Sequence, residues 1–99
     1  MSTVYGMTDD VPWDEVGYII SSQYRVTVLD RLVRGPATPS QIAADSNSTI
    51  AHVSRALKEL RNRSLVKLLV SEQRKKGRVY GITGDAESVW RIIEAQEMA

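Results

Sequence analysis

Apolar residues recur every three or four positions in several segments of the chain, and short polar stretches with glycine or proline separate these segments. This spacing predicts amphipathic helices, because residues three and four apart share one face of a helix. Residues 1–11 lack a clear period and are expected to form a flexible tail. The predicted helices cover about residues 11–20, 22–34, 39–45, 49–63 and 84–97.

Two short β-prone runs, at residues 65–70 and 78–82, follow the fourth predicted helix. The loop between them is polar and basic and contains Gly77, so the two runs are predicted to pair as a β-hairpin. Helices on both sides of a hairpin indicate an α+β fold that is mainly α. We expect a single domain over residues 12–98, with an additional helix at each end and no internal repeat.

The helices at residues 39–45 and 49–63 are separated by a short run of turn-forming residues, which predicts a helix-turn-helix over residues 39–63. Asn47 tolerates a left-handed backbone and is expected to make the tight turn. Ser48 is expected to accept hydrogen bonds from the first free amides of the second helix. Such a turn would hold the second helix outward, so that it could enter the major groove of DNA, which is about 12 Å wide.

The predicted helix at residues 49–63 has two contrasting faces when residues are placed about 100° apart. The inner stripe consists of Ile50, Val53, Leu57 and Leu60. The outer face is polar, partly basic and short-chained near its start. It consists of Ser48, Ala51, His52, Arg55, Glu59 and Asn62.

Charged residues are distributed unevenly, although the net charge of the chain is only +1. Residues 49–80 hold nine basic and two acidic side chains, a net charge of +7, and the remaining residues sum to −6. A basic middle with acidic ends is expected where one face meets a polyanion, and the alternative is that the helices simply carry solvated charges. Because the chain has no cysteine, disulfides, thiolate zinc sites and cysteine nucleophiles are excluded.

The segment PSQIAADSNSTIAHVSRALKEL, followed by SLVKLLVSEQRKKGRVYGIT, resembles the winged helix-turn-helix regulators of bacteria and archaea. The run SSQYRVTVLDRLVRGPATPSQIA is similar to the opening helices of their ArsR-like branch. The resemblance implies a dimeric transcriptional regulator whose third main helix contacts bases and whose hairpin, the wing, contacts the DNA backbone. The chain departs from the family at Asn47, where a glycine is common. It also lacks the cysteine ligands of the metal-sensing members, so metal sensing in their manner is not expected.

Arg55 lies on the outer face of the helix, where its guanidinium could contact guanine O6 and N7 together, worth about 1–3 kcal/mol of discrimination. The alternative is a solvated or phosphate-bound arginine. His52 has no acidic or cysteine neighbours at ligand spacing, so contact with phosphate or base is favoured over metal binding. The predicted base-contacting residues are Ser48, Thr49, Ala51, His52 and Arg55.

Four basic residues surround Gly77 in the hairpin loop, and they repel one another unless a polyanion is near. Contact with the DNA backbone is therefore favoured over a role in solubility alone. Glu59 would be repelled by phosphates, so it is expected either to accept from cytosine N4 or to mark where the helix leaves the groove. The predicted backbone-contacting residues are Lys58, Asn62, Arg74, Lys75, Lys76 and Arg78.

Both terminal helices carry a tryptophan and further apolar residues, which exceed what so small a domain is expected to bury. Homodimerisation through these helices is predicted, and completion of the core is the alternative. Two-fold symmetry would place two recognition helices on successive faces of the major groove. The predicted interface residues are Trp13, Ile19, Trp90 and Ile93.

The leading hypothesis is a transcriptional regulator that binds double-stranded DNA sequence-specifically. The alternatives are a sequence-tolerant architectural protein of the nucleoid and a winged-helix protein-interaction module. No nucleophile with a base at recognisable spacing and no phosphate-binding glycine loop occur, so an enzyme is not expected, nor is a cofactor, a metal or a small-molecule effector. Without a secretory signal or a run of about 18 apolar residues, we expect a cytoplasmic, nucleoid-associated protein with no membrane contact.

Overall fold

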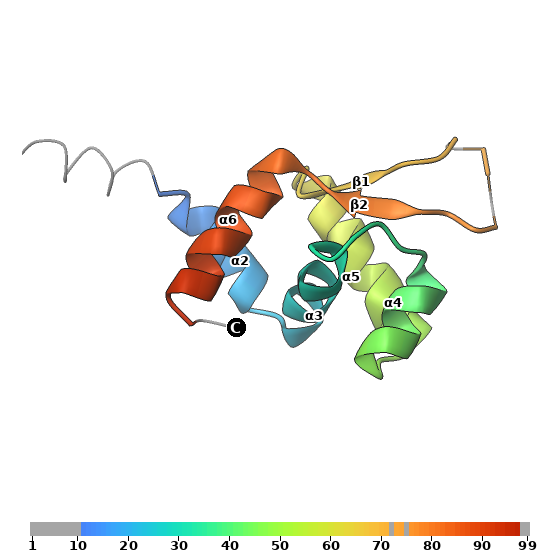
Figure 1. The fold of residues 1–99 in the computed structure, drawn as a ribbon, viewed down its shortest axis with the longest axis horizontal. Helices are drawn as coiled ribbons and strands as arrows, with labels where there is room; N and C mark the ends of the chain where they lie inside the picture. The colour runs from blue at the N-terminus through green and yellow to red at the C-terminus, as the bar shows by residue number, and fades with distance from the viewer. Residues whose placement is uncertain (1–10, 72, 75, 98–99) are drawn as a thin grey trace, which may run out of the picture.

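The computed structural model describes residues 11–71, 73–74 and 76–97. Over these residues the chain forms five helices and one two-stranded hairpin, so the expected α+β fold is confirmed (Figure 1). Residues 1–10 of the expected tail, and Lys75 of the expected backbone contacts, lie outside the described residues. In chain order the elements are α2 (Trp13–Ile20), α3 (Gln23–Leu32), α4 (Pro39–Ser46), α5 (Ile50–Asn62), β1 (Val66–Leu68), β2 (Tyr80–Ile82) and α6 (Gly84–Ala95).

Helices α3, α4 and α5 pack against one another and form the centre of the domain. In α3 and α5 the buried residues lie three or four positions apart, which is the spacing of one helix face, whereas α4 buries two adjacent residues. Burial of one valine, leucine or isoleucine side chain stabilises the fold by about 1.5–3 kcal/mol. The buried residues of these helices are Val28, Leu29 and Leu32 of α3, Ile42 and Ala43 of α4, and Val53, Ala56, Leu57 and Leu60 of α5.

Side-chain caps fix the starts of the helices around this centre. The hydroxyls of Ser22, Thr38 and Thr83 accept hydrogen bonds from the third backbone amide that follows each of them. At Thr38 the bond is reciprocal, since the Gln41 side chain accepts from the Thr38 amide at 2.9 Å. Each of these caps satisfies a donor that the helix itself leaves unpaired.

Strands β1 and β2 are antiparallel, with Val66 opposite Ile82 and Leu68 opposite Tyr80. They are shorter than the predicted runs at residues 65–70 and 78–82, although the Leu69 amide continues the ladder by donating to the Val79 carbonyl at 2.8 Å. An unpredicted bridge joins Tyr80 to Ala37 through two backbone hydrogen bonds of 2.9 and 3.1 Å. The bridge ties the wing to the loop between α3 and α4.

Helices α2 and α6 pack side by side at one end of the molecule, and the tip of the hairpin lies at the other end (Figure 1). Ile19, Trp90 and Ile93 are buried inside this one chain, at 3% exposure or less. Their assignment to a dimer interface is therefore corrected to the core: the small domain does bury these large side chains, because α2 and α6 cover each other. Of the four predicted interface residues only Trp13 is exposed.

Candidate nucleic-acid interface

The turn between α4 and α5 is built around Asn47, whose φ of 55° and ψ of 41° are left-handed. The left-handed residue lets the chain reverse while the Ser48 amide bonds back to the Ala43 carbonyl at 3.0 Å. Asparagine is one of the few non-glycine residues that adopt this conformation at low cost. The turn therefore has the geometry predicted from the sequence and sets the direction in which α5 leaves it.

The cap of α5 is Thr49 and not Ser48, so the cap prediction was wrong by one residue. Thr49 has extended backbone angles, and its hydroxyl accepts from the His52 amide at 3.2 Å. Its hydroxyl also lies 2.8 Å from His52 Nδ1. The Ser48 hydroxyl instead donates to the Ser46 carbonyl at 3.4 Å, within the turn. Both hydroxyls are thus engaged by the protein itself.

Ile50 was expected on the inner stripe of α5, but 53% of it is exposed. The prediction was wrong because it assumed a helix that starts at residue 49. Ile50 is instead the first helical residue and lies at the edge of the core. Ala56, which was not included in the predicted inner stripe, lies in the middle of α5 and is buried. An apolar side chain therefore stands at the exposed start of α5.

His52 stacks on Tyr24 of α3, with ring centroids 4.2 Å apart and an interplanar angle of 14°. The Thr49 contact holds the same imidazole from its own helix. The ring is thus fixed between α3 and α5 while the residue stays exposed. No group of three or more histidine, cysteine, aspartate or glutamate residues that could hold a metal occurs among the described residues.

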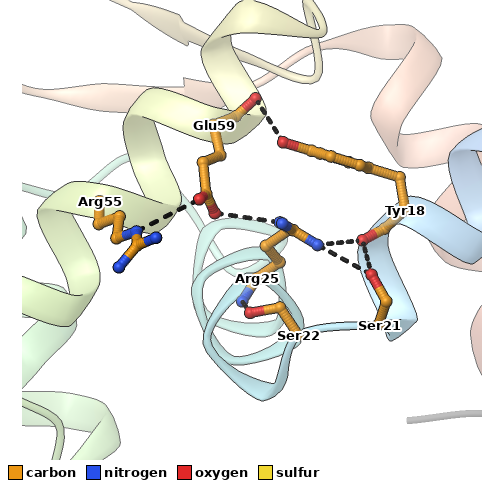
Figure 2. A network of polar contacts seen from close by, with 6 residues as sticks. All are labelled: Tyr18, Ser21, Ser22, Arg25, Arg55 and Glu59. Atoms are coloured by element: carbon orange, nitrogen blue, oxygen red, sulfur yellow. Dashed lines mark hydrogen bonds and ion pairs between the residues drawn. The ribbon is translucent and has the colours of Figure 1, made fainter.

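Arg55 and Glu59 lie one helical turn apart on the outer face of α5, with Arg55 Nε 3.5 Å from Glu59 Oε2. The other carboxylate oxygen of Glu59 accepts from Arg25 Nε of α3 at 3.1 Å (Figure 2). The sequence placed Glu59 on a surface that would meet phosphates, where an anion is repelled. The structure shows instead that two arginines neutralise this carboxylate, and Arg25 was not among the predicted functional residues.

A groove separates the second half of α5 from the wing, and it brings together residues predicted to contact the DNA backbone. Lys58 and Asn62 line it from α5, and Arg78 lines it from the segment that precedes β2. Arg61 of α5 also lines this groove. Ser54 and Tyr80 complete the walls. Cations from two elements that are separate in sequence thus face one concave surface.

The loop of the wing is shaped by its own arginines. Arg74 Nε donates to the Lys76 carbonyl at 2.9 Å, and Arg78 Nε donates to the Arg74 carbonyl at 2.6 Å. Gly77 has a φ of 63°, which accommodates the reversal without a side-chain penalty. Arg74 and Lys76 are exposed, so their charges face the solvent beside the groove.

Neither a protein-family model nor a curated protein matches the sequence. No helix among the described residues is both long and apolar enough to cross a membrane.

Several solved structures share the fold. The homodimeric winged helix-turn-helix DNA-binding domain of a possible ArsR-family transcriptional regulator from Mycobacterium bovis has a TM-score of 0.67 and 22% identity, over 98% of this chain and 86% of that one. A MarR-family transcription regulator has a TM-score of 0.71 and 20% identity, over 98% of this chain and 66% of its own. A mutant of Lactococcus lactis ZitR in complex with DNA has a TM-score of 0.58 and 23% identity, over 74% of this chain.

The match covers about half of the ZitR chain in the DNA complex and in one structure of a second mutant, at 49% and 50%, and 74% of that second mutant in its apo form. At these identities the likeness concerns the fold, and the arrangement of α4, α5 and the hairpin accounts for it. The chain therefore has the winged helix-turn-helix fold that ArsR-family and MarR-family transcription regulators also have.

Proposed function

We propose that this protein is a transcriptional regulator that binds double-stranded DNA sequence-specifically as a homodimer. The observation that carries the proposal is the groove between α5 and the wing. Its walls join Lys58 and Asn62 on the outer side of α5 with Arg78 of the hairpin. Cations on a helix and on an adjacent hairpin match the two contacts that a winged helix makes with DNA, one in the major groove and one on the neighbouring backbone.

In this proposal the first half of α5 lies in the major groove and discriminates between bases. Arg55 is 82% exposed at its side chain, so it can reach guanine O6 and N7. Ala51 and His52 are exposed one turn earlier and would border the neighbouring base pairs. Ile50 adds an exposed apolar side chain suited to the methyl group of thymine. Thr49 and Ser48 contribute less, because their hydroxyls are engaged in the cap and the turn.

The groove cations and the wing provide the affinity that is independent of sequence. Lys58, Asn62 and Arg78 would contact phosphates next to the major groove, and the exposed Arg74 and Lys76 would contact the backbone beyond it. Each neutralised phosphate releases counterions, so binding should weaken with salt. Such a role requires the protein to act in the cytoplasm, with the nucleoid.

Homodimerisation would use α2 at the end of the molecule away from the wing. Trp13 and Ile20 are large apolar side chains on this helix, and they are 49% and 39% exposed. Exposed apolar residues at the same end can form a self-complementary interface about a two-fold axis. The Mycobacterium bovis domain of the same fold is homodimeric, which supports the proposal.

Selection of bound duplexes from a randomised DNA library, followed by equilibrium titration at fixed salt, tests the proposal. A recurrent motif is expected, bound at least about 10³-fold more tightly than a scrambled duplex. A ratio near one with strong salt dependence would instead identify an architectural protein. Absence of any salt-dependent DNA affinity would favour a protein-interaction module.

A further inference from the structure

A chain of polar contacts runs from α2 through α3 to the exposed Arg55 of α5 (Figure 2). Arg25 is its centre, with only 15% of its side chain exposed. Its Nε donates to Glu59 Oε1 at 3.1 Å, and its Nη1 donates to the Tyr18 carbonyl at 2.6 Å and to the Ser21 hydroxyl at 2.9 Å. Its guanidinium carbon also lies 3.9 Å from the centroid of the Tyr18 ring.

These contacts hold Arg25 from several directions, so its guanidinium has little freedom to move. Glu59 is held in turn, because one of its carboxylate oxygens accepts from Arg25. The Tyr18 hydroxyl donates to the backbone carbonyl of Glu59 at 3.3 Å, which ties the same turn of α5 to α2. The carboxylate is therefore a fixed acceptor at the surface, and it differs from an ordinary exposed glutamate, whose side chain samples many rotamers.

The second oxygen of this carboxylate faces Arg55, whose Nε lies 3.5 Å away. Contact through Nε leaves the two terminal nitrogens of the guanidinium directed elsewhere. Two parallel N–H groups are what bidentate contact with guanine O6 and N7 requires. An exposed arginine otherwise loses rotamer freedom when it binds a base, and prior restraint reduces that loss.

We propose that Glu59 is a positioning residue for sequence recognition, which orients Arg55 for guanine and is itself oriented by Arg25. The inference rests on the proposed function. It explains why a carboxylate lies on a surface that would meet DNA. A carboxylate with no such role would only repel phosphates and weaken binding. It also extends the set of specificity-determining residues to Arg25, which lies on a different helix from Arg55.

The test uses the full chain and the motif selected from a randomised library. The position contacted by Arg55 is the guanine whose preference disappears in Arg55→Ala. At that position the ratio of dissociation constants between guanine and the other bases is measured for the wild type and for Glu59→Gln. We expect Glu59→Gln to lower this ratio by up to about tenfold, the scale of one arginine's rotamer freedom, while affinity for scrambled DNA stays equal or rises.

The double variant Glu59→Gln with Arg55→Ala distinguishes a positioning role of Glu59 from a merely structural one. In the Arg55→Ala background, Glu59→Gln should leave base preference unchanged, because its effect passes through Arg55. Arg25→Lys keeps the charge but cannot form the same set of contacts, so it should lower the same ratio. This variant also tests the inference if Glu59→Gln fails to fold. Asp30→Asn, an exposed carboxylate on α3, is the matched control for charge and should leave the ratio unchanged.

An unchanged ratio in both Glu59→Gln and Arg25→Lys, with affinity shifted equally for all sequences, would overturn the inference. Selective binding that Arg55→Ala leaves intact at every position would overturn it too, while the proposed function would stand. Failure to select any motif would overturn both.

Discussion

The hydroxyl of Thr49 caps α5 and also contacts the imidazole of His52, so one side chain both caps the start of α5 and fixes a residue on its outer face. Thr49 and its neighbour Ser48 have the same kind of donor and acceptor, and the sequence therefore could not distinguish which of them is the cap. The backbone decides: the left-handed Asn47 directs Ser48 back towards the turn and leaves Thr49 extended.

Replacement of Thr49 by alanine should lower the free energy of unfolding by about 0.5–2 kcal/mol, the usual cost of removing an N-cap. Ser48→Ala removes the same group from the next residue and should cost less, because the Ser48 hydroxyl caps no helix amide. Urea denaturation of both variants measures the difference. An equal or larger decrease for Ser48→Ala would contradict the observed cap.

The elements of the fold were largely predictable, since helical spacing and turn residues are local features of the sequence. The caps at Thr38 and Thr83 and the left-handed Asn47 belong to this local kind. What could not be predicted are contacts between distant residues, such as the bridge of Ala37 to Tyr80 or the pairing of Arg25 with Glu59. Periodicity shows which side of a helix is polar, but it contains no information on which partner approaches that side.

The same distinction applies to the site. Charge density along the sequence identified the wing and α5 separately, and the fold adds the groove in which Lys58, Asn62 and Arg78 meet. Ile50 shows the limit of the helical wheel, because residues in the first turn of a helix extend past the core that the wheel assumes. The exact start of α5 therefore matters more for the half of the helix that is proposed to contact bases than for the remainder.

The wing should contribute affinity without specificity. In a variant with Arg74→Ala and Lys76→Ala together, binding to the selected and scrambled duplexes should weaken by the same factor. The slope of log K against log salt should decrease by up to about 0.9 for each phosphate that the variant no longer neutralises. Titration at several salt concentrations measures both quantities.

Arg34→Ala is the matched control, because Arg34 is an exposed arginine in a groove that is also lined by Asp30, Asp45, Glu94 and Glu97. Phosphates are not expected in such surroundings, so the slope should be unchanged. A slope that is equally unchanged in the wing variant would remove the wing from the interface.

At the scale of the whole molecule, the terminal helices complete the core and are proposed to form the dimer contact, two roles that the sequence did not separate. Their inner residues, Ile19, Trp90 and Ile93, complete the core of one chain. Trp13 and Ile20 stay exposed on α2 and are available to a second copy. The apolar surface that they offer is smaller than the surface that the four predicted interface residues would have offered together. An interface of this kind would dissociate more readily than one built like a protein core.

Sedimentation equilibrium at micromolar concentration should give twice the chain mass of 11.1 kDa. Trp13→Glu together with Ile20→Glu should give the monomer, because each variant side chain would place a carboxylate in the apolar contact. Ile50→Glu makes the same kind of change at 53% exposure on α5 and should leave the dimer intact. A wild-type protein that sediments only as a monomer would contradict the proposed dimer.

In the proposed complex, α5 contacts base edges in the major groove through Arg55. Methylation interference on the selected duplex tests this contact most directly, because methyl groups on guanine N7 project into the major groove and those on adenine N3 into the minor groove. We predict that methylation of at least one guanine N7 in each half-site blocks binding of the wild type, and that Arg55→Ala removes this block. Binding that tolerates methylation of every guanine N7 but not of adenine N3 would contradict the proposed recognition by α5.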